Sequence, residues 1–151
     1  MNIRLIQPDE LDALLALYQH LHPDDAPLPA RPQIEATWQQ ILSSPGHRYF
    51  GCYQQDELVA SCCLSLMANL TRGCRPYGLI ENVVTHAAHR QRGHARAVLD
   101  HALQVAWAAG CYKVMLMTGN LDPATLRFYR NAGFDPDAKQ AFIARPPEQN
   151  P

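Results

Sequence analysis

The sequence predicts one α/β domain, with a mixed and mostly antiparallel sheet that carries helices on both of its faces. A length of 151 residues fits a single domain and allows a proper core. Short apolar runs alternate with stretches of helical spacing, and a helix-sized segment separates the runs at 79–85 and 112–117. Such a crossover makes those two strands parallel, whereas the shorter links before them favour antiparallel neighbours. We expect the domain to span residues 1–145, followed by a mobile tail at 146–151.

The first half of the chain is expected to hold a strand, two helices and a hairpin. Alternation at 1–6 predicts the strand, and Pro8 can open the helix that follows because its missing N–H costs nothing there. A loop with four prolines, HPDDAPLPARP, separates this helix from a second one at about 32–43. The runs HRYFGCYQ and ELVASCCLSLM then predict two strands joined by a tight turn at Gln55-Asp56. The apolar residues that give the first helix its spacing are Leu11, Leu14, Leu15, Tyr18 and Leu21.

The second half is expected to begin with a strand–helix–strand unit. A polar loop, ANLTRGCRPYG, leads into the strand LIENVVT at 79–85, and a basic turn follows it. The helix after the turn should run over about 94–109 and end at Gly110, before the short strand YKVMLM at 112–117. The buried stripe of this helix is expected to be Val98, Leu99, Ala102, Leu103 and Ala106.

One further helix and one further strand should close the domain. Asp122 can cap the last helix, Pro123 suits its first position, and Gly133 can end it. The run QAFIA predicts a final strand near 140–144.

Composition excludes several classes of function. A net charge of −1 argues against nucleic acid as a partner, and the longest weakly charged apolar stretch is too short to span a membrane. The five cysteines are odd in number and show no CxxC spacing, and the first residues lack the apolar core of a signal sequence. We therefore expect reduced thiols in a cytoplasmic protein. Seven histidines are present without HExxH or paired Cys/His spacing, so no metal site is expected.

The basic turn HRQRGHAR at 89–96 is the strongest candidate for a binding site. It lies between an apolar strand and an amphipathic helix, where bare backbone N–H groups and the positive end of the helix dipole favour phosphate. Gly93 lets a ligand approach the backbone closely, and the arginines around it add positive charge. The alternative is a solvated, arginine-rich helix start. Neither GxxxxGK(S/T) nor GxGxxG is present, so the usual nucleotide loops are excluded.

Two motifs in this order resemble the GNAT superfamily of acetyl-CoA-dependent N-acetyltransferases. Residues 90–95, RQRGHA, have the form Q/R-x-x-G-x-G/A, and FYRNAGF at 128–134 follows at the end of a later helix. The resemblance is close over about 77–135, and the N-terminal half agrees in its order of elements. The stretches IENVV and GCYKV are most similar to small-molecule members, including the glucosamine-phosphate acetyltransferase type.

The resemblance implies where acetyl-CoA would bind. The backbone around Val83 and Val84 would pair with the pantetheine arm, in a slot where this strand splays from the parallel strand beside it. A backbone N–H near Val83 would stabilise the oxyanion of the tetrahedral intermediate. The pyrophosphate would rest on the turn formed by Arg90, Gln91, Arg92, Gly93, His94, Ala95 and Arg96.

The resemblance also implies two catalytic residues. An amine must lose a proton before it attacks, and Glu81 takes the position of the general base in many members, often acting through water. The departing thiolate needs a proton, and Tyr129 takes the position of the general acid. The alternatives are a structural carboxylate at Glu81 and a core aromatic ring at Tyr129.

Three positions depart from the family pattern. Gln91 stands where glycine is common, and His94 stands where an aliphatic residue is common. We expect His94 to be exposed rather than to touch a phosphate. Asp122 replaces an asparagine seven residues before the tyrosine and is expected to serve as a helix cap, while Asn120 could take over a cofactor contact.

The expected activity is acetyl transfer from acetyl-CoA to a primary amine of a small molecule, by direct attack in a ternary complex. The acceptor stays open, because Asp24 and Asp25 would attract a cationic amine whereas Arg72 and Arg75 would favour an anionic one. Two other classes remain as alternatives: a non-catalytic acyl-CoA-binding module on the same fold, and a nucleic-acid-binding module that uses the arginines as a phosphate clamp. Pairing through the C-terminal strands of similar proteins makes a homodimer the expected assembly.

Overall fold

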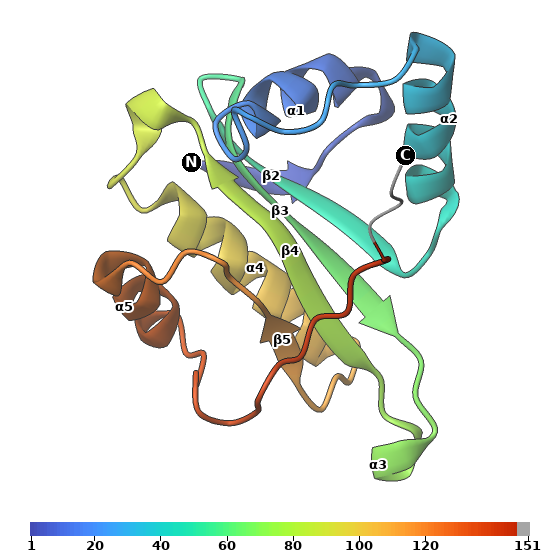
Figure 1. Cartoon of the computed structure of the whole chain (residues 1–151), viewed down its shortest axis with the longest axis vertical. Helices are drawn as coiled ribbons and strands as arrows, with labels where there is room; N and C mark the ends of the chain where they lie inside the picture. Colours follow the sequence, from blue (N-terminus) through green and yellow to red (C-terminus); the bar gives the residue numbers. More distant parts are fainter. Residues whose placement is uncertain (148–151) are drawn as a thin grey trace. The chain divides into compact units, whose positions relative to one another are not determined.

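The computed structural model, drawn in Figure 1, describes residues 1–147. These residues fall into two compact units. The first unit spans Met1–Leu116 and the second begins at Met117. The first unit contains β1 (Asn2–Leu5), the 3₁₀ helix η1 (Pro8–Glu10), α1 (Leu11–Tyr18), α2 (Arg31–Ser43), β2 (His47–Gln54), β3 (Glu57–Met67), α3 (Thr71–Cys74), β4 (Tyr77–Thr85), the 3₁₀ helix η2 (Ala87–His89), α4 (His94–Ala108) and β5 (Val114–Leu116). The second unit contains α5 (Pro123–Asn131).

The five strands form one mixed sheet in the order β1-β2-β3-β4-β5. The first three pairings are antiparallel, and β4 and β5 are parallel. The hairpin between β2 and β3 turns through two residues with positive φ, Gln55 at 50° and Asp56 at 65°. Two successive positive φ values match the right-handed twist of the flanking strands. The predicted fold class, including the parallel pair joined through a helix, is confirmed.

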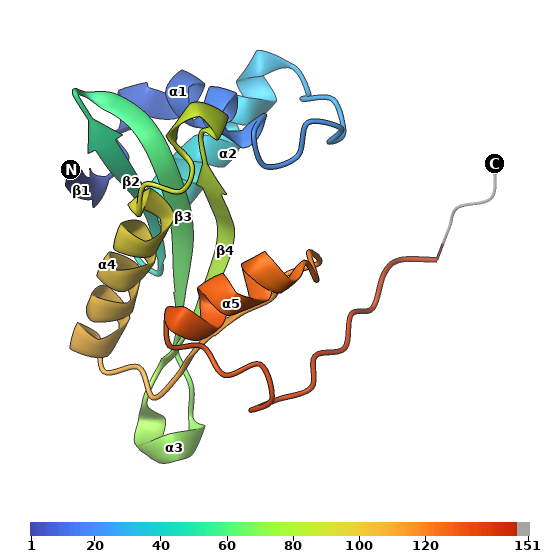
Figure 2. The same ribbon diagram turned by 90° about the vertical axis from the view of Figure 1, so that its left-hand side faces the viewer.

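Helices cover both faces of the sheet because alternate residues of each strand point to opposite sides (Figure 2). On one face α4 packs on β2 and β3, where the ring of His101 meets Phe50 edge-on at 4.9 Å between centroids. On the other face the neighbouring residue Tyr49 meets Trp38 of α2 at 5.6 Å. The indole nitrogen of Trp38 donates to the carbonyl oxygen of Pro8 over 3.0 Å, so α2 is tied to the start of the α1 segment.

A bidentate ion pair fixes the N-terminal strand to the helix that follows it. Both terminal nitrogens of Arg4 lie 2.8 Å from the carboxylate of Glu10, and the hydroxyl of Tyr53 donates to the same carboxylate over 2.9 Å. The Arg4 guanidinium holds the pKa of Glu10 down at about 2. This network orients β1 against β2 and leaves its own charges fully partnered.

Three expected elements differ from the structure. The strand predicted at 140–144 is wrong: no strand is present there, and Phe142 and Ile143 are exposed. A strand needs a paired neighbour for its backbone groups, and an apolar run alone does not supply one. The loop at 68–78 contains the short helix α3 and the first residues of β4, and the strand at 112–117 is shortened to β5.

Two further findings bear on the expected environment. No helix in residues 1–147 is long and apolar enough to cross a membrane. All five cysteines are free thiols, and four of them are buried, namely Cys52, Cys62, Cys63 and Cys111. The end of the expected tail, 148–151, lies outside the described residues.

Candidate active site

The sheet opens along β4. Parallel pairing with β5 begins at Gly78 opposite Val114 and ends at Ile80 opposite Leu116, while β4 continues to Thr85. From residue 81 onward, therefore, β4 keeps β3 as a neighbour but has no strand on its other edge within the described first unit. Backbone groups along such an edge can pair with an extended ligand. The binding of a pantetheine arm along this edge stays a prediction.

A β-bulge bends β4 where it leaves β5. Ser61 pairs with Val84 and Cys63 pairs with Glu81, so two residues of β4, Asn82 and Val83, stand opposite one residue of β3. Asn82 adopts φ of 52°, in the left-handed region that asparagine tolerates better than most residues. The sequence analysis missed this bulge, and an asparagine in the interior of a strand was the signal that could have indicated it.

Glu81 lies at the beginning of the unpaired stretch, and its side chain is exposed. The thiol of Cys63 donates to the Glu81 carbonyl oxygen over 3.2 Å, which fixes the backbone on the β3 side. Val84 is 4% exposed and packs in the apolar core with α1, so only its backbone is available to a ligand. An exposed carboxylate on a fixed backbone beside an open edge can accept a proton from a bound amine or from water.

The basic turn combines two left-handed residues with an uncapped helix end. Gln91 has φ of 59° and Gly93 has φ of 84°, so the chain folds back on itself before α4 begins at His94. Gly93 is the N-cap residue, and no side chain caps the first N–H groups of α4. Gln91 thus adopts the left-handed conformation that the glycine common at this position in the family would favour. Open N–H groups at the positive end of a fifteen-residue helix can hold an anion.

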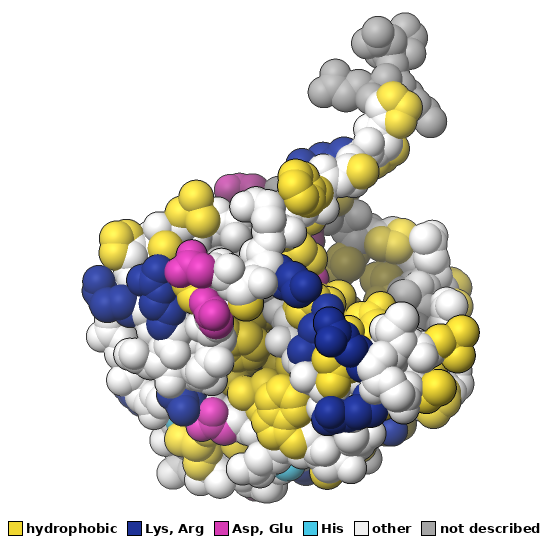
Figure 3. Space-filling model, turned by 90° about the horizontal axis from the view of Figure 1, so that it is seen from below, with side chains coloured by type: hydrophobic (Ala, Val, Ile, Leu, Met, Phe, Trp, Pro, Cys, Tyr) yellow, Lys and Arg dark blue, Asp and Glu magenta, His cyan; other side chains and the backbone are white. Residues whose placement is uncertain are grey.

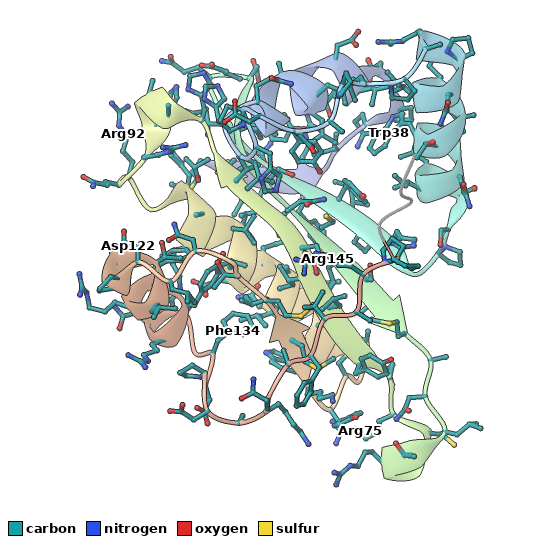
Figure 4. All side chains as sticks on the ribbon, in the orientation of Figure 1. Trp38, Arg75, Arg92, Asp122, Phe134 and Arg145 are labelled. Carbon is teal, nitrogen blue, oxygen red and sulfur yellow. The ribbon has the colours of Figure 1, made fainter. Side chains whose placement is uncertain are left out.

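The three arginines of the turn differ in their partners. Arg90 donates to the carbonyl oxygens of Thr85 (3.4 Å) and His20 (3.0 Å), so it braces the turn from within. Arg96 forms an ion pair with Asp100 at 2.8 Å along α4. Arg92 is exposed, and within residues 1–147 it has no hydrogen bond or ion pair to another side chain (Figure 4). Of the three, Arg92 is therefore the guanidinium most available to a ligand.

His94 is buried, contrary to the expectation of exposure. Its side chain is 5% exposed, and Nδ1 lies 3.6 Å from the sulfur of Cys52. The first residue of α4 lies on the same inward stripe as Val98 and Ala102, four and eight positions later, so it faces the sheet. Burial lowers the pKa of His94. Its backbone N–H still belongs to the open helix end, but its imidazole is not directed at a ligand on the turn's outer side.

The second unit carries Tyr129 on α5. Its ring meets Phe128 at 5.1 Å and Phe134 at 6.3 Å between centroids. Asp122 caps the helix as predicted, since its carboxylate accepts the N–H of Ala124 over 3.5 Å. The Asn120 side chain accepts the N–H of Asp122 over 3.0 Å, so it supports the cap. The role of Tyr129 as the general acid stays a prediction.

The charged residues that bear on the choice of acceptor lie in different parts of the first unit. Asp24 and Asp25 line a surface pocket after α1, together with Leu21, His22 and Pro23. Arg75, labelled in Figure 4, donates to the carbonyl oxygens of Gly110 (3.2 Å) and Cys111 (3.2 Å), at the end of β4 remote from the turn. Arg75 is thus occupied in supporting the start of β4. On the face viewed from below, Lys and Arg side chains lie among apolar ones (Figure 3).

Comparison with protein families decides the classification. The model described as the acetyltransferase (GNAT) family matches residues 11–134, which is most of the chain. The chain belongs to the GNAT acetyltransferase family. Membership of this family favours acetyl transfer over the non-catalytic alternative. In residues 1–147 no group of three or more His, Cys, Asp or Glu side chains could hold a metal ion.

Curated relatives narrow the comparison within the GNAT family. A glucosamine 6-phosphate N-acetyltransferase of Trypanosoma brucei brucei is 32% identical over 90 residues, 59% of each chain. A probable glucosamine 6-phosphate N-acetyltransferase 2 of Oryza sativa subsp. japonica is 34% identical over 80 residues, 53% of this chain and 46% of the relative. The chain spans about half the length of the glucosamine 6-phosphate N-acetyltransferases that it matches.

Solved GNAT structures share the whole fold. A provisionally named acetyltransferase from Agrobacterium tumefaciens str. C58 is 42% identical, with a TM-score of 0.90 over 97% of this chain and 100% of that one. A glucosamine-6-phosphate N-acetyltransferase from Arabidopsis thaliana has a TM-score of 0.80 over 95% and 97% of the two chains, at 18% identity. The second likeness shows the fold alone.

Proposed function

We propose that this GNAT enzyme transfers an acetyl group from acetyl-CoA to a primary amine of a small molecule. The proposal rests on one observation in the first unit: the unpaired edge of β4 leads along the chain directly to the basic turn. The unpaired edge of β4 ends four residues before the basic turn, and the turn presents open helix N–H groups beside the exposed Arg92. An extended thioester arm suits the edge, and a pyrophosphate suits the turn.

The chemistry then follows as direct attack in a ternary complex. Glu81 accepts the proton of the ammonium group, directly or through water. The amine nitrogen forms a bond to the thioester carbon, and a backbone N–H near Val83 stabilises the oxyanion. The carbon–sulfur bond then breaks, and Tyr129 gives a proton to the departing thiolate. The second proton of the amine nitrogen passes through water to the tyrosinate, and Glu81 releases its own proton to solvent, so that free CoA and the neutral acetamide are the products.

Two observations support a small-molecule acceptor. The curated relatives named above are glucosamine 6-phosphate enzymes, and their matches cover a little over half of this chain. The pocket lined by Asp24 and Asp25 would favour an acceptor that carries a positive charge in addition to the reacting amine. The relatives suggest an amino sugar, and the pocket suggests a cationic amine, so both belong in the first panel of acceptors.

We also propose that the enzyme is a cytoplasmic homodimer. The five free thiols suit a reducing compartment. Phe142 and Ile143 are 89% and 60% exposed, which suits a segment that is covered by a second copy. Light scattering on the purified protein tests the assembly, and replacing both residues by serine should shift a dimer to the monomer mass.

Calorimetric titration with acetyl-CoA tests the central proposal. We expect micromolar binding that weakens roughly tenfold in Arg92→Ala, because one charge-assisted contact to phosphate is lost. Arg48→Ala is the matched control, since Arg48 lies at the start of β2 and donates to the carbonyl oxygen of His47. Absence of binding to acetyl-CoA and to other acyl-CoAs by a folded sample would refute the proposal. Release of CoA thiol across the panel of amines then identifies the acceptor.

A further inference from the structure

Four histidines form a row beneath the basic turn. The ring of His20, just after α1, lies 4.0 Å from that of His86, which follows β4. His86 lies 5.4 Å from His89, and His89 lies 6.0 Å from His94, the first residue of α4. All four belong to the first unit, and the catalytic proposal uses none of their imidazoles. The row therefore needs an explanation of its own.

Two of these imidazoles hold the backbone of η2. Nδ1 of His20 accepts the N–H of Ala87 over 3.4 Å, and Nδ1 of His86 accepts the N–H of Ala88 over 3.2 Å. A ring nitrogen that accepts a hydrogen bond carries no proton, so both histidines are neutral in this arrangement. The same loop of chain is held by Arg90, which donates to the carbonyl oxygen of His20 over 3.0 Å.

The surroundings disfavour protonation at two members of the row, His20 and His94. Burial and the neighbouring His86 and Arg90 lower the pKa of His20. Burial also lowers the pKa of His94, and His89, Arg92 and the N-terminal amine act in the same direction.

Two imidazole nitrogens of the histidine row lack hydrogen-bond partners within the described chain, and a carboxylate lies near one of these rings. Nδ1 of His89 and Nε2 of His94 are buried without a hydrogen-bond partner in the part of the chain that the structure describes. The other group that faces His94 is the thiol of Cys52, at 3.6 Å. Among residues 1–147, the carboxylate of Glu57 faces the row, 3.6 Å from Nε2 of His89.

Protonation would therefore loosen the turn. A proton on Nδ1 of His20 or His86 would face the backbone N–H of Ala87 or Ala88, so that the hydrogen bond is lost. Two imidazolium rings with centroids 4.0 Å apart would also repel each other. A cation at His94 would lie at the positive end of the α4 dipole. Because the folded-state pKa values of His20 and His94 are lowered, the neutral forms stabilise the fold above the ordinary histidine pKa of about 6.5, and this stabilisation is lost as the pH falls below it.

We propose that His20 and His86 are positioning residues that hold the phosphate-binding turn only while neutral, so that acetyl-CoA affinity falls on acidification. The inference rests on the proposed function for its ligand. An imidazolium on the ligand side of the turn would attract phosphate instead. The acceptor nitrogens, however, face the backbone of Ala87 and Ala88, so a proton placed there disrupts the turn before it can contact a ligand.

Replacement by asparagine separates the hydrogen bond from the titration. The side-chain oxygen of asparagine occupies nearly the position of Nδ1 and accepts the same N–H, but it takes up no proton in this range. Acetyl-CoA affinity is measured at about pH 7.5 and about pH 5.5, on either side of the ordinary histidine pKa. The samples are the wild type, His20→Asn/His86→Asn and His20→Ala/His86→Ala. His47→Asn is the control, because Nδ1 of His47 pairs with Ser65 at the far end of β2.

We expect the wild type and the His47 control to lose affinity about fivefold or more on acidification, as one or more hydrogen bonds are lost. The double asparagine variant should bind like the wild type at the higher pH and lose clearly less at the lower one. The double alanine variant should bind weakly at both. The phosphate monoester of the ligand also titrates near pH 6, but it does so equally in every sample. Equal losses in the wild type and the asparagine variant, or tighter binding at low pH, would overturn the inference.

Amide hydrogen exchange without ligand provides a second and independent readout. After correction for the intrinsic pH dependence of exchange, protection of residues 86–97 should fall on acidification in the wild type and stay constant in the asparagine variant. This measurement separates the two proposals. Failure to bind acetyl-CoA at neutral pH would refute the proposed function, whereas unchanged protection across the pH range would refute the positioning role.

Discussion

The two halves of β4 differ in what flanks them. Residues 77–80 run between β3 and β5, and Gly78 and Ile80 are buried there. Residues 81–85 have β3 on one side only, begin with two exposed side chains, and include the left-handed Asn82. The same strand is thus a closed part of the sheet over its first half and an open edge over its second.

Because of this difference, we expect the first half of β4 to contribute mainly to the stability of the fold and the second half mainly to ligand binding and catalysis. Pairing on both edges satisfies the backbone and fixes the position of the parallel pair. Pairing on one edge leaves N–H and C=O groups that a ligand can use, and the bulge changes the direction in which they point. Substitutions in the first half should therefore change the free energy of unfolding, and substitutions in the second half should change acetyl transfer.

The largest effect is expected at Glu81. Glu81→Gln keeps the shape of the side chain but removes the base, so kcat should fall about 10²–10⁴-fold once an acceptor is known. Thermal unfolding should stay unchanged, because the carboxylate is exposed. Steady-state kinetics at saturating acetyl-CoA provide the measurement.

Glu35→Gln is the control for this prediction. Glu35 lies on α2, where it pairs with Arg31 at 2.8 Å, so its loss should leave kcat within about twofold. A Glu81→Gln variant with wild-type kcat would assign Glu81 to the structural alternative, and the functional half of β4 would then act through its backbone alone.

The next largest effect is expected in the closed half, at Gly78. A Cβ at this position would approach side-chain atoms of Leu64 and Val114 to 3.1 Å. Gly78→Val should therefore destabilise the protein by about 1–3 kcal/mol, and Gly78→Ala by less, since overpacking grows with side-chain size. Denaturant titration measures both. A neutral Gly78→Val would mean that β5 moves away from β4 easily, and the contrast between the halves would lose its basis.

A smaller effect is expected at Asn82, where backbone and side chain can be separated. Asn82→Val should cost about 1–2 kcal/mol because a β-branched residue resists positive φ, whereas Asn82→Gly should be neutral or slightly stabilising. If the bulge aligns the open edge, acetyl transfer should survive in the glycine variant and decline in the valine variant. Loss of transfer in Asn82→Gly would show instead that the amide side chain, which lies beside Tyr18 and Cys63, is itself needed at the site.

The sequence predicted the paired strands of the sheet better than the local geometry of the open edge and the basic turn. Alternation and helical spacing located all five strands of the sheet, because burial of one face imposes a period that the sequence records. The bulge at Asn82 and the inward side chain of His94 have no periodic signal, since each depends on how β4 and α4 pack against β2 and β3. The false strand at 140–144 shows the opposite failure, in which a suitable pattern has no paired neighbour.

The smallest effect is expected at Tyr18, behind the open half of β4. Tyr18 packs in the core cluster that includes Val84, and its buried hydroxyl lies beside the side chains of Asn82 and Cys63 without forming a hydrogen bond of good geometry among the described residues. Burial raises the pKa of Tyr18 above its ordinary range. Tyr18→Phe removes a poorly satisfied polar group, so it should be neutral or stabilise the protein by up to about 1 kcal/mol. A fall in Tm of more than about 4 °C would show that the hydroxyl is hydrogen-bonded in solution. The core behind the open edge would then contain a polar link between α1 and β4, and the division into a structural and a functional half would have to include α1.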